Sequence, residues 1–130
     1  MKKIIFYTNQ YFGQIGGEDK AGVSPELISG SIGAANAFAG LLSTAEISST
    51  IVCGDNYYAE NIETAREYIC SLIEKEGADM LIAGPAFNAG RFGMACGDIC
   101  TAVAEKFNIP TLGQTRRICT YCAGKRRYRA

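Results

Sequence analysis

Short runs of β-branched and aromatic residues alternate along this chain with longer segments of helical periodicity, and this alternation constrains the fold most. Strands are predicted over residues 3–8, 49–53 and 79–84, and a fourth is predicted to begin at residues 110–112. Between these runs, apolar side chains recur every three or four residues, which is the spacing of one helical face. This order predicts βαβ units and therefore an α/β fold.

Three segments carry the helical period. Residues 31–42 form the first, and the clearest runs from Ile62 to about Lys75, where Asn61 is placed to cap the start and Gly77 to end the helix. The last predicted helix covers residues 99–107, in which apolar side chains step by four. Each helix is long enough to cross over a sheet between two parallel strands.

The strand at residues 79–84 shows too little alternation of polar and apolar side chains for a face in water, as is typical of a parallel strand buried on both sides. We therefore predict a three-layer α/β/α doubly wound parallel sheet of the flavodoxin or Rossmann type, with about four strands in an incomplete domain. Residues 1–113 are expected to form this α/β domain.

The last 17 residues differ in charge from the rest of the chain. Residues 1–113 hold seven basic and all 13 acidic side chains, whereas residues 114–130 hold six basic and no acidic ones. A basic end of this kind could attract phosphates. The composition favours instead a solvated, disordered tail. The acidic body offers no basic surface around this tail, which argues against nucleic-acid binding.

Two features that the sequence lacks exclude whole classes of protein. The chain has no histidine, which excludes Ser-His-Asp and Cys-His hydrolases and His-ligated zinc sites. No window reaches the roughly 18 consecutive apolar residues that a membrane span needs, and Lys2 and Lys3 lead into a strand rather than a signal-peptide core. The sequence therefore predicts a cytoplasmic protein without a membrane partner.

Three loops are expected to meet at the carboxyl edge of the sheet, where open α/β sheets bind ligands. These loops span residues 9–20, 54–60 and 84–93, and the third combines glycines, free backbone N–H groups at a helix start and an arginine suited to a carboxylate or phosphate. A small polar substrate is thus predicted to contact five side chains at this edge: Glu18, Asp55, Asn56, Asn88 and Arg91.

Each loop also has a purely structural interpretation. The first is read more simply as a Gly-rich turn with the solvated charges of Glu18 and Lys20. The second is equally compatible with a turn and a helix start with packed tyrosines, instead of tyrosines that wall a pocket. For the third loop, the alternative is a strand-to-helix turn in which Arg91 pairs with a surface acid; the anion site is favoured over it.

The cysteines predict neither a metal site nor a catalytic thiol. Cys96 and Cys100 lie four residues apart on one helical face, which is typical of inert core cysteines. Cys119 and Cys122 have C-x-x-C spacing, but one pair supplies only two of the four ligands of a structural zinc. We therefore predict no catalytic residue, no metal and no cofactor in this chain.

Three segments in the same order resemble the amino-terminal part of the selenoprotein subunit of component B of glycine, sarcosine and betaine reductases. They are residues 16–21 (GGEDKA), 53–61 (CGDNYYAEN) and 84–97 (GPAFNAGRFGMACG). The resemblance covers roughly residues 1–112, whereas the family's subunit is several-fold longer.

The resemblance implies an oxidoreductase role in amino-acid-fermenting anaerobes, namely reductive C–N cleavage of glycine or an N-methylated glycine. In that family a pyruvoyl-containing component B subunit holds the amine. A selenocysteine of the selenoprotein subunit, which this chain resembles, attacks the carbon that bears nitrogen. The carboxymethyl group then passes to selenoprotein A, acetyl phosphate is the eventual product, and thioredoxin supplies electrons. A selenolate is ionised at neutral pH, unlike a thiol with a pKa near ~8.5.

The segment that bears the family's selenocysteine has no counterpart here, and Cys119 and Cys122 do not take its place. We therefore expect a fragment of a component B subunit that is inactive alone, with residues 114–130 as a non-family tail. Two alternatives remain open: a stand-alone module that binds a small ligand or a nucleotide such as a flavin, and an assembly piece that docks reductase subunits.

Overall fold

The computed structural model describes residues 2–33, 35–39, 45–84, 90–114, 119–123 and 126–129. Its elements in chain order are β1 (Lys2–Thr8), the 3-10 helix η1 (Glu18–Lys20), β2 (Glu26–Ser29), α1 (Ala35–Ala39), β3 (Ala45–Val52), α2 (Asp55–Glu60), α3 (Ile62–Glu76), β4 (Met80–Ala83), α4 (Gly90–Phe107), β5 (Thr111–Gln114), β6 (Cys119–Ala123) and β7 (Arg126–Arg129).

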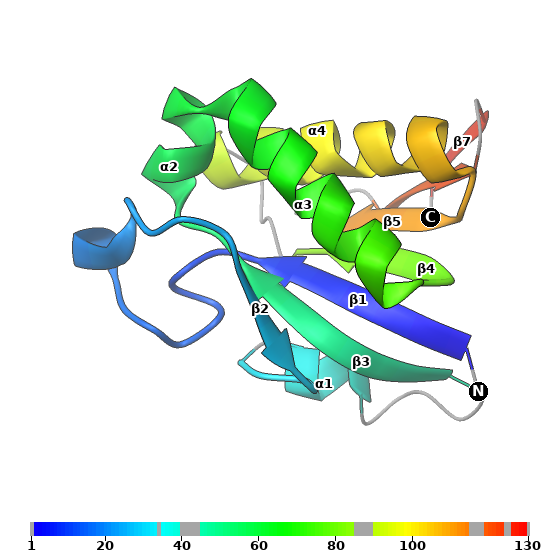
Figure 1. Cartoon of the computed structure of the whole chain (residues 1–130), viewed down its shortest axis with the longest axis horizontal. Coiled ribbons are helices and arrows are strands. Elements are labelled where there is room, and N and C mark those ends of the chain that lie inside the picture. The colour runs from blue at the N-terminus through cyan, green and yellow to red at the C-terminus, as the bar shows by residue number, and fades with distance from the viewer. Residues whose placement is uncertain are drawn as a thin grey trace.

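Four parallel strands form the centre of the sheet (Figure 1). β1 lies between β3 and β4, and β4 pairs with β5, in each case parallel. The whole sheet has the order β2-β3-β1-β4-β5-β6-β7. Numbered among themselves, the parallel strands run 2-1-3-4, which is the flavodoxin-like doubly wound order. The predicted α/β fold with about four parallel strands is therefore confirmed.

The outer strands pair antiparallel and were not predicted. β2 pairs with β3 at one edge, and its four residues are too few to show a period. At the other edge β6 pairs with β5 and β7 with β6, in the segment for which the basic composition favoured disorder. The domain boundary proposed at residue 113 stays a prediction.

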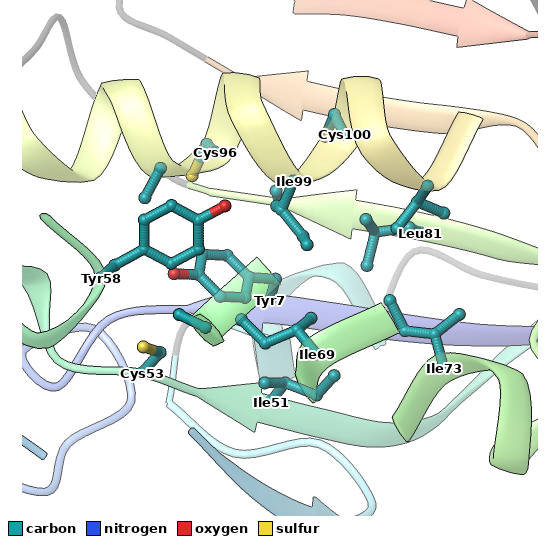
Figure 2. Close-up of a cluster of buried hydrophobic side chains, with 14 of the residues drawn as sticks. Tyr7, Ile51, Cys53, Tyr58, Ile69, Ile73, Leu81, Cys96, Ile99 and Cys100 are labelled. Carbon is teal, nitrogen blue, oxygen red and sulfur yellow. The ribbon is translucent and has the colours of Figure 1, made fainter. Parts of the chain in front are cut away.

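Both faces of the parallel strands are buried. Ile5 and Tyr7 of β1 face a larger core beneath α3 and α4, in which Figure 2 shows Tyr7 among the buried side chains. Ile4 and Phe6 face a smaller core that includes Ala35 of α1. Successive residues of a strand point to opposite faces, so a fully buried strand needs a layer on each side. The result is the predicted three-layer order, with α3 and α4 above the sheet and α1 below it (Figure 1).

The α3 helix follows its predicted bounds closely. Ala65, Ile69 and Ile73 are buried at four-residue spacing, and Gly77 ends the helix in the left-handed conformation (φ 68°) with its N–H donating to the Ile73 carbonyl. The prediction that the Asn61 side chain caps the start is wrong. Asn61 Nδ2 donates to the Tyr57 carbonyl at 3.1 Å and thus closes the preceding helix, α2.

Other boundaries differ from the sequence expectations. The helix expected over residues 31–42 is described as the five residues of α1, and α4 begins nine residues before Ile99. The expected loop over residues 54–60 is largely helical, because α2 occupies Asp55–Glu60. Acidic and amide residues after a glycine suit a turn and a helix start equally well, which explains the error.

Within the described residues, no helix is long and apolar enough to cross a membrane.

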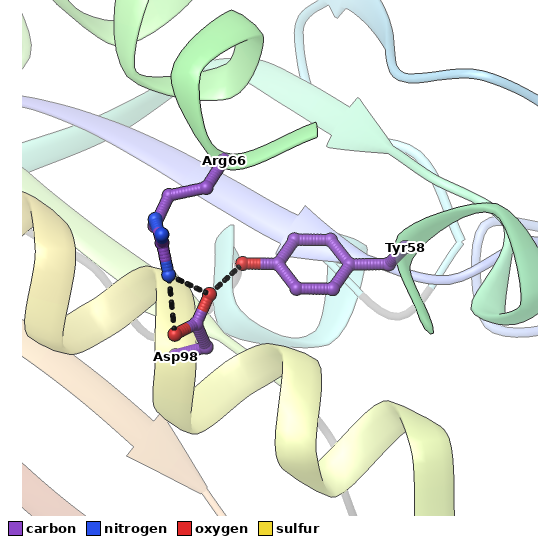
Figure 3. A network of polar contacts seen from close by, with 3 residues as sticks. All are labelled: Tyr58, Arg66 and Asp98. Atoms are coloured by element: carbon purple, nitrogen blue, oxygen red, sulfur yellow. Dashed lines mark hydrogen bonds and ion pairs between the residues drawn. The ribbon is translucent and has the colours of Figure 1, made fainter. Parts of the chain in front are cut away.

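One polar cluster joins the three helices of the upper layer (Figure 3). The Tyr58 hydroxyl of α2 donates to Asp98 Oδ2 of α4 at 2.5 Å, and Arg66 Nη1 of α3 contacts both oxygens of Asp98 at 3.0 and 3.1 Å. Tyr58 is fully buried, so its hydroxyl depends on this acceptor. Asp98 therefore holds α2 and α3 to α4.

Replacing Asp98 by alanine is expected to lower the free energy of unfolding by about 1–3 kcal/mol, because the Tyr58 hydroxyl loses its acceptor. Arg66→Ala should cost clearly less than this, since the Arg66 side chain is 34% exposed and water screens the ion pair. Urea denaturation measures both. Equal losses for the two variants would show that the ion pair, and not the tyrosine, determines the contribution of Asp98.

Candidate functional site

The segments that follow β1, β3 and β4 come together at the carboxyl edge of the sheet. Asn9 Nδ2, just after β1, donates to Asp55 Oδ2 at the start of α2 at 3.1 Å. The rings of Phe12 and Phe92, from the loop after β1 and the first turn of α4, lie 5.9 Å apart. The expectation that these three segments share one edge is met in the described residues.

Asn9 and Gln10 are site residues that the sequence reasoning missed. Both are buried, with 5% and 2% exposed. Asn9 Oδ1 accepts the Phe12 N–H at 2.9 Å, and Gln10 Oε1 accepts the Asp55 N–H at 3.1 Å. Their position directly after a strand is the signal in the sequence that points to them. Together they tie the first loop to α2.

The first loop is a closed turn. The Gly13 N–H donates to the Asn9 carbonyl at 2.9 Å, and the Ile15 N–H to the Gln10 carbonyl at 3.1 Å. Gln14 between them has a φ of 62°, a conformation that costs a non-glycine residue energy. The predicted contact residue Glu18 begins η1, and its side chain lies outside the described part.

Asp55 and Asn56 are the first two residues of α2. The N–H groups of Asn56 and Tyr57 both donate to the Ala21 carbonyl, at 2.8 and 3.0 Å. Asp55 is 8% exposed, and its carboxylate lies at the positive end of the helix. The neighbouring Tyr58 is packed in the larger core, so it does not wall a pocket, whereas Tyr57 is only partly buried.

The third loop is described only in part. Asn88 lies outside the described residues, and Arg91 is the second residue of α4 with its side chain outside the description. The anion site expected at these two residues therefore stays a prediction. Phe92, next to Arg91, is buried and stacks on Tyr7 with ring centroids 6.3 Å apart.

Four cysteines are buried in the described part of the chain. Cys53, Cys70, Cys96 and Cys100 are buried and form no disulfide, which confirms the core position predicted for Cys96 and Cys100. Burial raises the pKa of the Cys53 thiol from 9.0 to about 12 and also raises the pKa of Cys96. These thiols are therefore protonated at neutral pH, and thiolates are the reactive form.

The raised pKa of Cys53 predicts a loss of stability in alkali. Between pH 9 and 12 the unfolded thiol is ionised while the folded one keeps its proton, so stability falls as the pH rises. From pH 8 to 11 the free energy of unfolding of the wild type should fall by roughly 2 kcal/mol more than that of Cys53→Ala. Urea titrations at each pH measure this difference, and parallel pH curves would contradict it.

Among the described residues, no three His, Cys, Asp or Glu side chains are grouped closely enough to hold a metal ion. What the described edge offers is a buried carboxylate, that of Asp55, which accepts a hydrogen bond from the Asn9 amide, while the Gln10 amide oxygen accepts the main-chain N–H of the same residue. Such a carboxylate can accept hydrogen bonds from a cationic or polar group.

Comparison with known proteins places the chain in a family. A family model for glycine/sarcosine/betaine reductase selenoprotein B matches residues 1–117. The betaine reductase complex component B subunit beta of Peptoclostridium acidaminophilum is 50% identical over 112 residues, 86% of this chain and 26% of that protein. The sarcosine reductase complex component B subunit beta of the same organism is 45% identical over 111 residues, 85% of this chain and 26% of that protein.

A glycine reductase complex component B subunit gamma, from Symbiobacterium thermophilum, is also 45% identical over 111 residues, with the same shares of the two chains, 85% and 26%. The chain thus spans about a quarter of the length of these relatives. No solved structure matches it. The family model covers the strands from β1 to β5, and on this ground the chain belongs to the glycine/sarcosine/betaine reductase selenoprotein B family.

Proposed function

We propose that this chain takes part in reductive C–N cleavage of glycine or an N-methylated glycine, with acetyl phosphate as the eventual product. The single observation that carries the proposal is the 50% identity to a betaine reductase component B subunit over 112 residues. The chain would act in the cytoplasm with a pyruvoyl-containing component B subunit, selenoprotein A and the thioredoxin system.

In this proposal the carboxyl edge of the sheet holds the amino-acid substrate. Such substrates carry a carboxylate and an ammonium group, so a site needs a cation for one and an anion for the other. Arg91 and Asn88 would bind the carboxylate, and Asp55, with Asn56 and Glu18, would face the ammonium group. The hydrogen bond from Asn9 to Asp55 supports this assignment, because it fixes one carboxylate oxygen.

The nucleophile would come from the family subunit outside the segment that this chain matches. The buried, protonated cysteines of the described residues support this, because a thiol with a pKa near 12, like that of Cys53, is a poor nucleophile at neutral pH. The chain by itself is then inactive, and it supplies one wall of the substrate site.

Arg91→Ala should weaken binding of glycine or acetate by about tenfold or more, because a charge-assisted hydrogen bond contributes roughly 1.5–3 kcal/mol. Arg91→Lys should restore only part of the affinity, since an ammonium lacks the planar fork of the guanidinium. Calorimetric titration of the three proteins measures these affinities. If all three bind equally, Arg91 is a surface residue and the anion site is lost.

A further inference from the structure

Two buried side-chain hydroxyls in the described part of the chain have no hydrogen-bond partner, those of Thr8 and Ser48. Buried polar groups are nearly always paired, and an unpaired one costs free energy. Ser48 is the extra residue where the register between β1 and β3 shifts, and such a bulge re-aims a side chain. Thr8 lies in regular pairing, opposite Val52, so its unpaired hydroxyl has no such local cause.

Thr8 stands at the point of the sheet where ligands of this fold class bind. The connection after β1 passes below the sheet through α1, and the connection after β4 passes above it through α4 (Figure 1). Because β1 and β4 are neighbours, the two connections part at their carboxyl ends. In open α/β sheets, ligands usually bind at such a point. Thr8 is the last residue of β1.

The main chain around Thr8 is held on both sides. The Cys53 N–H donates to the Thr8 carbonyl at 3.1 Å, and the Gly84 N–H donates to the Tyr7 carbonyl at 3.1 Å. Gly84 follows β4 with a φ of 154°, which side chains rarely allow. Thr8 is 0% exposed, so bulk water does not satisfy its hydroxyl. A hydrogen bond formed there is shielded from water and is stronger for that reason.

We propose that Thr8 is a further substrate-binding residue, whose hydroxyl donates a hydrogen bond to a carboxylate oxygen of the amino-acid substrate. The assignment rests on the proposed function, which places this substrate at the carboxyl edge. Thr8 directly precedes Asn9, whose amide donates to the Asp55 carboxylate. The chain thus places a neutral donor beside the anion proposed to face the ammonium group. The ligand has to displace the atoms that shield the hydroxyl in this structure.

The test is Thr8→Val in the full chain, because valine keeps the shape of the side chain and removes the hydroxyl. Thr50→Val is the matched control. Thr50 is also 0% exposed, but its hydroxyl donates to the Gly30 carbonyl at 2.8 Å. Thr8→Ser keeps the hydroxyl and serves as the conservative variant. Calorimetric titration measures the affinity for acetate and for glycine, and urea denaturation measures the stability of each variant.

We expect Thr8→Val to bind acetate and glycine roughly tenfold more weakly than the wild type, because a hydrogen bond to a charged group is lost. Its urea midpoint should equal or exceed that of the wild type, since valine replaces an unpaired buried hydroxyl. Thr50→Val should behave in the opposite way, with unchanged affinity and a lower midpoint. Thr8→Ser should keep most of the affinity.

Equal affinities of Thr8→Val and the wild type would overturn the role of Thr8 and leave the proposed substrate site in place. A midpoint of Thr8→Val that falls as far as that of Thr50→Val would show that the fold or a buried water already satisfies the hydroxyl, and would also overturn it. If the wild type binds neither acetate nor glycine, the proposed substrate site itself fails, and the assignment of Thr8 fails with it.

Discussion

Replacing Gly54 by alanine is expected to lower the free energy of unfolding by about 3 kcal/mol or more, because the new methyl group would collide with rigid backbone. A Cβ at Gly54 would lie 2.2 Å from the Ala21 carbonyl oxygen and 2.7 Å from the Val23 nitrogen. The φ of Gly54 is an ordinary −67°, so the cost arises from this close approach alone.

The collision also reaches the candidate site. The Gly54 N–H donates to the Val23 carbonyl at 2.9 Å, and the Ala21 carbonyl accepts from the first turn of α2. A shift of residues 21–23 would therefore displace Asp55 from Asn9.

Gly97→Ala is the matched control, since nothing lies within 4 Å of its Cβ position in α4, and alanine should stabilise that helix by roughly 0.5–1 kcal/mol. Thermal and urea denaturation should give opposite signs for the two variants, and a neutral Gly54→Ala would contradict the packing described.

If Asp55 faces the ammonium group as proposed, Asp55→Asn is expected to reduce amine affinity by roughly tenfold to a hundredfold, because the substitution removes the negative charge while keeping the shape of the side chain. Asparagine can still accept the hydrogen bond that Asn9 donates to this position at 3.1 Å. Folding should therefore change little, which separates loss of binding from loss of structure. The effect is measured by calorimetric titration of glycine, sarcosine and betaine into a chimera, in which residues 1–117 replace the matched quarter of the betaine reductase subunit beta of Peptoclostridium acidaminophilum.

Glu105→Gln is the charge-matched control for Asp55→Asn. Glu105 is an exposed residue in the last turns of α4, far along the helix from Phe92 and the carboxyl edge, so its loss should leave amine affinity unchanged. Unchanged affinity in Asp55→Asn would remove Asp55 from the site. An equal loss in both variants would indicate that net charge, and not a specific contact, determines binding.

The parallel centre of the fold was predictable because it is built from uninterrupted apolar runs. β4, for example, buries both faces and reads as a continuous apolar segment. β2 was not predictable, because its four residues are stabilised by pairing with β3 and carry no pattern of their own. α2 was missed because Gly54, Asp55 and Asn56 suit a turn as well as a helix start, and packing of Tyr58 in the larger core selects the helix.

The edge at which the candidate segments meet was predictable, but the contacts within it were not. The carboxyl edge follows from the strand order alone, and Asp55 was identified from its position after a strand. The pairing of Asp55 with Asn9, 46 residues earlier, depends on how the loop after β1 closes over the sheet. No local pattern encodes such a contact, which arises only when β1 and β3 lie side by side.

The most direct test of the proposed function is the activity of the chimera that carries residues 1–117. It is assembled with the other betaine reductase components, and acetyl phosphate formed from betaine is measured against the same assembly without the α/β segment. The account predicts betaine-dependent product from the chimera and none from the chain alone. A chimera that folds and assembles but forms no acetyl phosphate would contradict a role of this chain in reductive C–N cleavage.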